Sequence, residues 1–144
     1  MINSPGLTAS LADCRVIELE THPDPRGSLT VAQNSESLPL KLRRVFYIFD
    51  IPHGAERGGH AHFDMNELII AVSGCFDVQV TDGVDSRTFT LLRPNQGLFL
   101  PAGIWRSLDN FSSGAVCLTL CDTDFNEADY IREFPRYLSL RRHE

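Results

Sequence analysis

Two histidines and a glutamate are spaced in this sequence so that they can build one polar site. His60 and His62 are one residue apart, and Glu67 follows five residues after the second histidine. Side chains two positions apart on an extended chain point to the same side, so both imidazoles can enter one pocket. Glu67 begins the next apolar stretch and can point into the same space. Because imidazole titrates near neutrality and also binds metals, this trio predicts acid/base chemistry or a metal centre.

The segments that must position these residues are predicted to be β-strands joined by tight turns. Stretches rich in β-branched and aromatic residues recur about every 8 to 12 residues, which is typical of an antiparallel sandwich or barrel. Phe76, Val78 and Val80 alternate with more polar residues, as in a half-buried strand, and Asp82-Gly83 predicts a hairpin turn. The expected strands cover residues 43–50, 67–73, 75–81, 86–92, 97–101, 104–108 and 115–121.

A helical segment is expected in the C-terminal tail, over about residues 124–140. Asp124 or Asn126 can cap its start, and the apolar residues that follow lie at helical spacings. Pro135 disfavours helical geometry at the residue before it, so a break is predicted there. Residues 141–144 are expected to fray.

Length and charge restrict the function classes. The 144 residues suit one domain, 1–144, with a barrel core at about 15–122. The net charge is −6, from 13 Lys and Arg against 19 Asp and Glu, which argues against a nucleic-acid partner. A small anionic ligand remains possible, because it needs only a few arginines.

Membrane insertion and secretion are not expected. No apolar run approaches the ~18 residues of a membrane span, and the N-terminus lacks the charge and hydropathy pattern of a signal peptide. The four cysteines form no C-x-x-C pair, and three of them lie in apolar runs. We therefore expect reduced, structural thiols in a cytoplasmic protein.

The segment from Gly54 to Gly74 resembles the first conserved motif of the cupin superfamily. It matches that motif at each fixed position: the first glycine, His60, His62, Glu67 and the final glycine. The resemblance implies an all-β fold, a single-domain cupin that forms a double-stranded β-helix or jelly-roll barrel. The short helical tail would follow this barrel.

The second cupin motif is only partly present. Pro101, Gly103 and Asn110 are kept, but Arg106 occupies the position where metal-binding members carry a histidine. Arginine is a permanent cation and a very poor metal ligand, so it can pair with Glu67 and replace the charge of a metal. We expect no metal and no other cofactor. The alternative is a metal-dependent cupin enzyme that uses the two histidines and the glutamate.

Beyond these motifs, the sequence resembles the WxcM-like (FdtA-type) sugar-nucleotide 3,4-ketoisomerases of the cupin superfamily, over about residues 26–138. The segments that carry this resemblance are 26–29, 44–49, 57–62, 82–83, 97–98, 104–105, 109–113 and 129–132. The resemblance implies a metal-free homodimer acting on dTDP-4-keto-6-deoxyglucose. Its members move the carbonyl from C4 to C3 and so prepare the sugar for amination.

The resemblance also implies roles in catalysis. The reaction needs a base near neutrality to remove the C3 proton and donors to hold the enediolate. His60 is the expected acid/base, and His62 its partner in proton transfer or in orienting the sugar. Arg44 shares a strand face with Phe46 and Ile48, and it can stabilise the enediolate or bind phosphate if that face is inward.

Five further residues are expected to contact substrate. Arg26 and Arg57 can bind the diphosphate, because a planar guanidinium matches phosphate oxygens. Trp105 can stack on the sugar or thymine, or serve as a core residue. Glu67 and Arg106 are expected to line the pocket.

Two positions depart from the family pattern. Phe46 stands where members usually have a tyrosine, and it lacks the hydroxyl that could donate a proton. Glu67 stands where glutamine is common, so a carboxylate can replace the lost hydroxyl or restore a metal ligand. A non-catalytic cupin that binds sugar nucleotides is the third interpretation.

Overall fold

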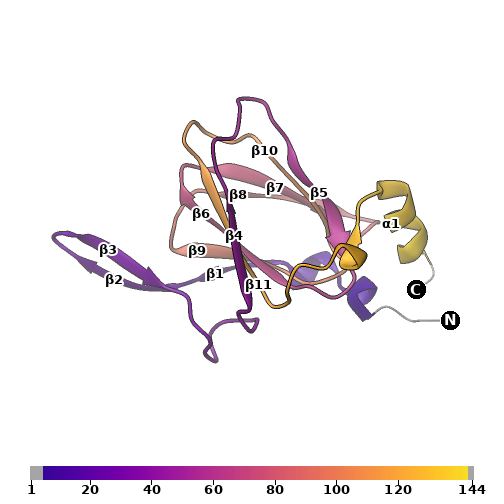
Figure 1. Cartoon of the computed structure of the whole chain (residues 1–144), viewed down its shortest axis with the longest axis horizontal. Coiled ribbons are helices and arrows are strands. Elements are labelled where there is room, and N and C mark those ends of the chain that lie inside the picture. The colour runs from indigo at the N-terminus through magenta and orange to yellow at the C-terminus, as the bar shows by residue number, and fades with distance from the viewer. Residues whose placement is uncertain (1–4, 143–144) are drawn as a thin grey trace.

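The computed structural model describes residues 5–142, and it consists mainly of two antiparallel sheets that face each other in a jelly-roll barrel (Figure 1). The first sheet has the order β1 (Arg15–Glu18), β9 (Gln96–Leu100), β6 (Glu67–Ser73), β11 (Val116–Cys121) and β4 (Arg44–Ile48). The second has the order β12 (Tyr130–Ile131), β5 (Arg57–His62), β10 (Trp105–Asp109), β7 (Phe76–Thr81) and β8 (Ser86–Leu91). The predicted strands and the all-β cupin fold are confirmed.

The main hydrophobic core lies between the two sheets. Along β7, buried and half-buried residues alternate strictly, because every second side chain points between the sheets. Phe76, Val78 and Val80 from β7 pack in one cluster with Leu98 of β9 and Leu108 of β10. The polar side chains of His60, His62 and Glu67, from β5 and β6, also lie close together.

A hairpin that the sequence pattern did not reveal extends away from the barrel in Figure 1. It consists of β2 (Glu20–Asp24) and β3 (Gly27–Val31), which pair with each other in a two-stranded sheet. Its residues are almost all exposed. Its turn carries Arg26.

The tail is ordered differently from the prediction. Asn126 does cap a helical turn, accepting a hydrogen bond from the backbone N–H of Ala128, but η3 (Glu127–Asp129) is a single 3-10 turn. The chain then forms β12 on the edge of β5. Helix α1 (Phe134–Arg141) begins where a break was expected, because a proline in the first turn needs no N–H partner. The expected frayed end lies partly outside the described residues.

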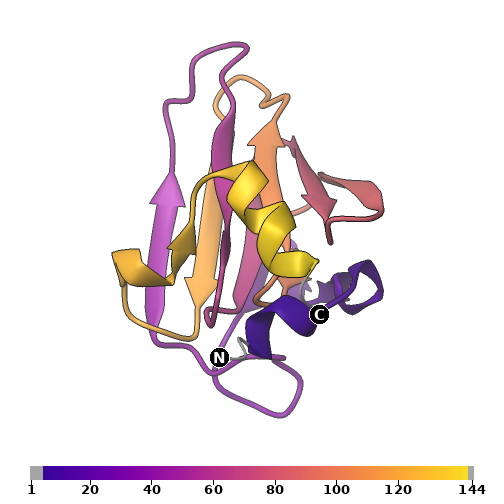
Figure 2. The ribbon, with the colours of Figure 1, turned by 90° about the vertical axis from the view of Figure 1, so that its right-hand side faces the viewer.

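The two remaining short helices, η1 (Pro5–Thr8) and η2 (Leu11–Asp13), lie near α1, as Figure 2 shows for this end of the molecule. Tyr137 anchors α1, since its buried hydroxyl lies 2.7 Å from the carbonyl of Gly103 and 3.1 Å from that of Thr81 and can donate its proton to either one. Over residues 5–142, no helix is long and apolar enough to cross a membrane. All four cysteines are free thiols.

Candidate active site

A β-bulge in β5 sets which side chains enter the barrel. Arg106 of β10 pairs with His60, but Leu108 pairs with Arg57, so β5 has one more residue than β10 between these pairs. Partners across a sheet share a face, so Arg57 lies on the same face as His60 although it is three residues away. Gly58 permits the bulge: its φ is +80°, and a Cβ there would lie 2.8 Å from a methyl carbon of Leu108.

His62 is fully buried between two carboxylates. Its Nδ1 lies 3.2 Å from Oδ2 of Asp129, and its Nε2 lies 3.2 Å from Oε1 of Glu67. The ring of Tyr130 packs against it at 4.4 Å between centroids. Neither Asp129 nor Tyr130 was predicted as a site residue. The signal available was the 129–132 segment, which was interpreted as part of a helix.

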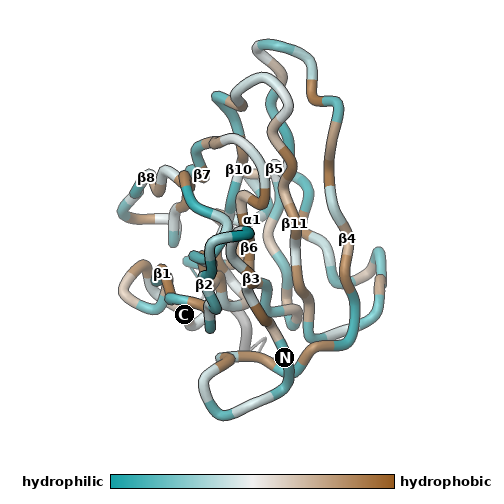
Figure 3. Tube along the Cα trace, turned by 90° about the vertical axis from the view of Figure 1, so that its left-hand side faces the viewer, coloured by the Kyte–Doolittle hydropathy of each residue, from teal (hydrophilic) through white to brown (hydrophobic). Residues whose placement is uncertain are grey.

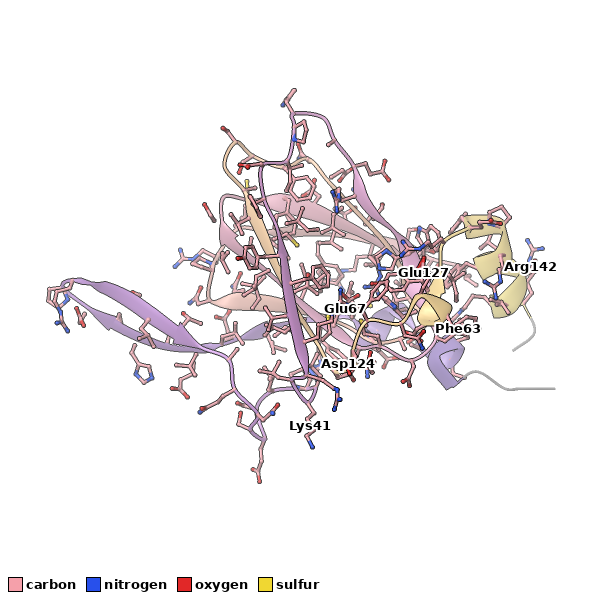
Figure 4. The ribbon with its side chains drawn as sticks, in the orientation of Figure 1. Lys41, Phe63, Glu67, Asp124, Glu127 and Arg142 are labelled. Carbon is pink, nitrogen blue, oxygen red and sulfur yellow. The ribbon has the colours of Figure 1, made fainter. Side chains whose placement is uncertain are left out.

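Glu67 and Arg106 form a buried ion pair inside the barrel, where Figure 4 shows Glu67 between the two sheets. The Arg106 guanidinium also donates to the carbonyl of Ile104 from Nε (3.3 Å) and Nη2 (3.1 Å). The Cys121 thiol lies 3.8 Å from the second oxygen of Glu67. Burial alone would raise the pKa of Glu67, but Arg106 and His62 outweigh it and hold that pKa at about 2. Glu67 is therefore ionised and already paired.

His60 lies beside this network and is uncharged. Its ring meets His62 edge-on, with centroids 4.7 Å apart, and Tyr130 lies 5.0 Å away. Burial, followed by the positive charge of Arg106, lowers the pKa of His60 to about 2. At neutral pH His60 is thus uncharged, as a general base must be, although so low a pKa makes it a weak base in the substrate-free protein.

Arg44 supplies a cation whose hydrogen-bonding groups are partly free. Its guanidinium lies 4.8 Å from the Phe46 ring and 5.3 Å from the Phe125 ring. Within the described part of the chain, its Nη1 is buried without a hydrogen-bond partner. A buried, unpaired guanidinium N–H is costly, so it favours an anionic ligand atom at this point.

Two predicted substrate residues do not join this cluster. Trp105 was expected to be able to stack on substrate, but it packs against Phe134 and Tyr137 at 5.1 and 5.6 Å. Neighbouring strand residues face opposite sides, so the inward position of Arg106 turns Trp105 outward. Arg26 lies at the tip of the hairpin and pairs with Asp24 at 3.0 Å, apart from the barrel site of its own chain.

The trio of His60, His62 and Glu67 does not fit a metal centre well. One ligand atom from each lies within 4.8 Å of the others, which is a suitable separation. However, Glu67 is already neutralised by Arg106, and a divalent cation would be buried next to that permanent charge. The residues present therefore favour chemistry carried by the side chains themselves.

Acid should destabilise the protein through His60. The unfolded histidine takes a proton near pH 6.5, whereas the folded one takes it near pH 2, so the unfolded state gains the proton first. As the pH falls below about 6, the free energy of unfolding should drop by roughly 1.4 kcal/mol per pH unit from this residue alone. Glu67 adds a loss in the same direction below pH 4.5.

Urea unfolding at pH 7, 6 and 5 measures this dependence. The His60→Asn variant should have a shallower dependence between pH 6 and pH 5 than the wild type. Equal slopes for the two proteins would show that His60 takes up its proton normally when folded.

Two facing antiparallel sheets with a pair of histidines directed between them define a cupin. The chain belongs to the FdtA family, described as WxcM-like, C-terminal, whose model matches residues 12–142.

Characterised relatives share most of the chain. It is 32% identical over 123 residues to TDP-4-oxo-6-deoxy-alpha-D-glucose-3,4-oxoisomerase of Aneurinibacillus thermoaerophilus, covering 85% of this chain and 88% of that protein. The WlaRB TDP-quinovose 3,4-ketoisomerase of Campylobacter jejuni is 35% identical with a TM-score of 0.84, covering 90% and 99% of the two chains. A His-to-Asn variant of the 3,4-ketoisomerase QdtA of Thermoanaerobacterium thermosaccharolyticum, in complex with TDP-4-keto-6-deoxyglucose, is 25% identical with a TM-score of 0.90, covering 93% and 97%.

Proposed function

We propose that this protein is a sugar-nucleotide 3,4-ketoisomerase, which converts a dTDP-4-keto-6-deoxyhexose into its 3-keto isomer. The observation that carries this function is the uncharged, half-buried His60 in a barrel of the FdtA family that also holds the partly free guanidinium of Arg44. Relatives that match most of the chain have this activity by name. The product belongs to deoxysugar biosynthesis, where a 3-keto group allows amination at C3.

The reaction can be written with these side chains alone. His60 removes the proton from C3, and the electron pair moves toward C4, so that O4 of the substrate becomes the oxyanion of an enediolate. Arg44 holds that oxyanion through its unpaired N–H. A proton passes from O3 to O4, and His60 returns its proton to C4, which leaves the carbonyl at C3. Atoms and charge balance without an added reactant.

The remaining site residues have supporting roles. Arg106 and Glu67 keep a fixed charge pair next to the histidines, in the place where other cupins hold a metal. Arg57 lies on the face of β5 shared with His60 and is exposed, so we assign it to the diphosphate. A keto-sugar complex of a His-to-Asn variant of QdtA supports a histidine as the residue that reacts.

Incubation with dTDP-4-keto-6-deoxyglucose in deuterium oxide tests the proposal. A 3-keto product should form with deuterium at C4, and exchange should also occur at C3. Activity should persist with EDTA, and the purified protein should contain less than stoichiometric metal. Nucleotide-sugar binding without exchange would instead favour the non-catalytic interpretation, and loss of activity with EDTA the metal-dependent one.

We also propose that the protein is a homodimer in the cytoplasm. Alternate residues of the edge strand β4 place apolar side chains on its outer side, and Val45, Tyr47 and the adjoining Phe49 are 55%, 61% and 58% exposed. Figure 3 shows β4 at the edge of the molecule, with hydrophobic stretches along its trace. A groove of about 600 Å³ beside the hairpin continues this surface and is lined in part by Ile70 and Leu118. A second copy would cover this surface, and the four free thiols suit a reducing compartment.

Replacement of Tyr47 and Phe49 by serine should weaken the dimer at least about tenfold, which corresponds to about 1.4 kcal/mol. Light scattering during size-exclusion chromatography should give the wild type about twice the 16.1 kDa of one chain and the double variant about one chain mass at low micromolar concentration. Val84→Ser is the control, because Val84 is 88% exposed on the turn after β7. A monomeric wild type, or a double variant that remains dimeric, would contradict the assignment.

A further inference from the structure

We propose that Asp129 is a positioning residue for catalysis, which fixes the orientation of the His62 ring and keeps a proton on its Nδ1. This role rests on the proposed function only for its effect on turnover. The effect on His62 itself can be measured without substrate.

The Asp129 carboxylate is held rigidly by the chain around β5. Its Oδ1 accepts a hydrogen bond from the backbone N–H of Asp64 at 2.8 Å, and its Oδ2 accepts one from Met65 at 3.2 Å. The Asp129 carbonyl accepts from the N–H of Phe63 at 3.0 Å. With its carboxylate fixed by two backbone donors, Asp129 can hold the His62 ring in a single orientation.

The chemistry of the contact decides the proton position on His62. Burial alone would raise the pKa of Asp129, but His62 and the two backbone donors outweigh it and lower that pKa. The carboxylate is therefore ionised and can only accept hydrogen bonds. The 3.2 Å contact between Nδ1 and Oδ2 therefore requires the hydrogen to be on Nδ1. On the other side of the ring, Nε2 lies 3.2 Å from Oε1 of Glu67, but within the described residues it is buried without a hydrogen-bond partner, and that oxygen already accepts from Arg106.

The same segment restrains the ring from its side. Tyr130 follows Asp129 directly, pairs with His62 in the β12–β5 ladder and packs against its ring. His62 in turn meets His60 edge-on, with the two planes at 82°. A rotation of the His62 ring would thus disturb the base directly. Within the described part of the chain, Asp129 makes no hydrogen bond or ion pair with Arg44 or Arg57, so its loss should reduce turnover more than substrate affinity.

The test compares Asp129→Asn with Asp124→Asn. Asparagine keeps the shape, but its amide presents an N–H₂ donor in place of one acceptor oxygen. Asp124 is a matched control, because it lies in the same loop and pairs with exposed Arg43 at 3.0 Å. We expect Asp129→Asn to lower kcat by about 10- to 100-fold, by analogy with other residues that orient an active-site histidine. KM should change by less than about threefold, and Asp124→Asn should match the wild type.

A long-range ¹H–¹⁵N spectrum of histidine-labelled protein supplies the second readout. The wild type should show a protonated Nδ1 for His62, and Asp129→Asn should lose that signature. A wild-type His62 without a proton on Nδ1 at neutral pH overturns the proposal, even if the variant does not fold. Unchanged spectra or unchanged kcat in a folded Asp129→Asn variant also overturn it. A wild type that fails to isomerise any 4-keto sugar, with the spectral change still present, would contradict the proposed function and leave the positioning of His62 intact.

Discussion

His60→Asn is expected to lower kcat for isomerisation by at least about 10³-fold, within the range that a general acid/base contributes. Asparagine preserves much of the size of the imidazole but cannot take the C3 proton. The assay is product formation by NMR together with deuterium incorporation at C3 and C4. Both should disappear, because the proposed base acts in the first step and again in the last.

Substrate binding should survive this change, since the proposed diphosphate contacts lie on Arg57 and not on His60. Titration calorimetry with dTDP should give Kd values within about threefold for wild type and variant. His53→Asn is the matched control, because His53 is exposed on the loop between β4 and β5. Persistent deuterium exchange in His60→Asn would assign the base to another residue.

Arg106→Met should destabilise the protein by about 3 to 5 kcal/mol, because it leaves the ionised Glu67 buried without its partner. Adding Glu67→Gln should restore at least half of that loss, since the remaining polar group is neutral and replacement of both ions removes the unpaired charge. The protein has a single tryptophan, Trp105, packed against α1, so urea unfolding followed by its fluorescence measures both effects.

The exposed ion pair of Arg132 with Glu127 provides a comparison. Its side chains are 51% and 62% accessible, and Arg132→Met should cost less than about 1 kcal/mol. If Arg106→Met were equally mild, the buried pair would not be a stabilising element of the fold. A double variant less stable than Arg106→Met would contradict the argument about unpaired charge.

The barrel strands could be predicted from the sequence because their signals are local. Alternation in β7 and the Asp82-Gly83 turn are determined within a few residues. The hairpin β2–β3 has no such signal, because most of its side chains are exposed and no burial pattern marks them. The prediction of a helix through the tail was wrong because Tyr130 and Ile131 fit helical spacing as well as strand spacing. Only their pairing with β5 makes them a strand.

The same distinction applies to the site. The sequence was enough to predict one cluster inside the barrel, because strand geometry and motif spacing direct its members to the same side. These members are His60, His62, Glu67 and Arg106. Asp129 could not be predicted, because its contact with His62 joins residues 67 positions apart. Strand alternation alone should have directed Trp105 away from Arg106. For Arg57 alternation gives the wrong side, since the bulge at Gly58 changes the face.

The docking of β12 onto β5 also affects how the protein is made. During synthesis His62 emerges from the ribosome long before Asp129 and Tyr130. A nascent barrel therefore contains its histidines without the residues that hold them in position. Such long-range pairing forms slowly, because the entropic cost of closing a long loop comes before any stabilising contact is made. Synthesis therefore has to pass about residue 131 before the catalytic geometry exists, and a chain that stops short of that residue would be a barrel without an ordered active site.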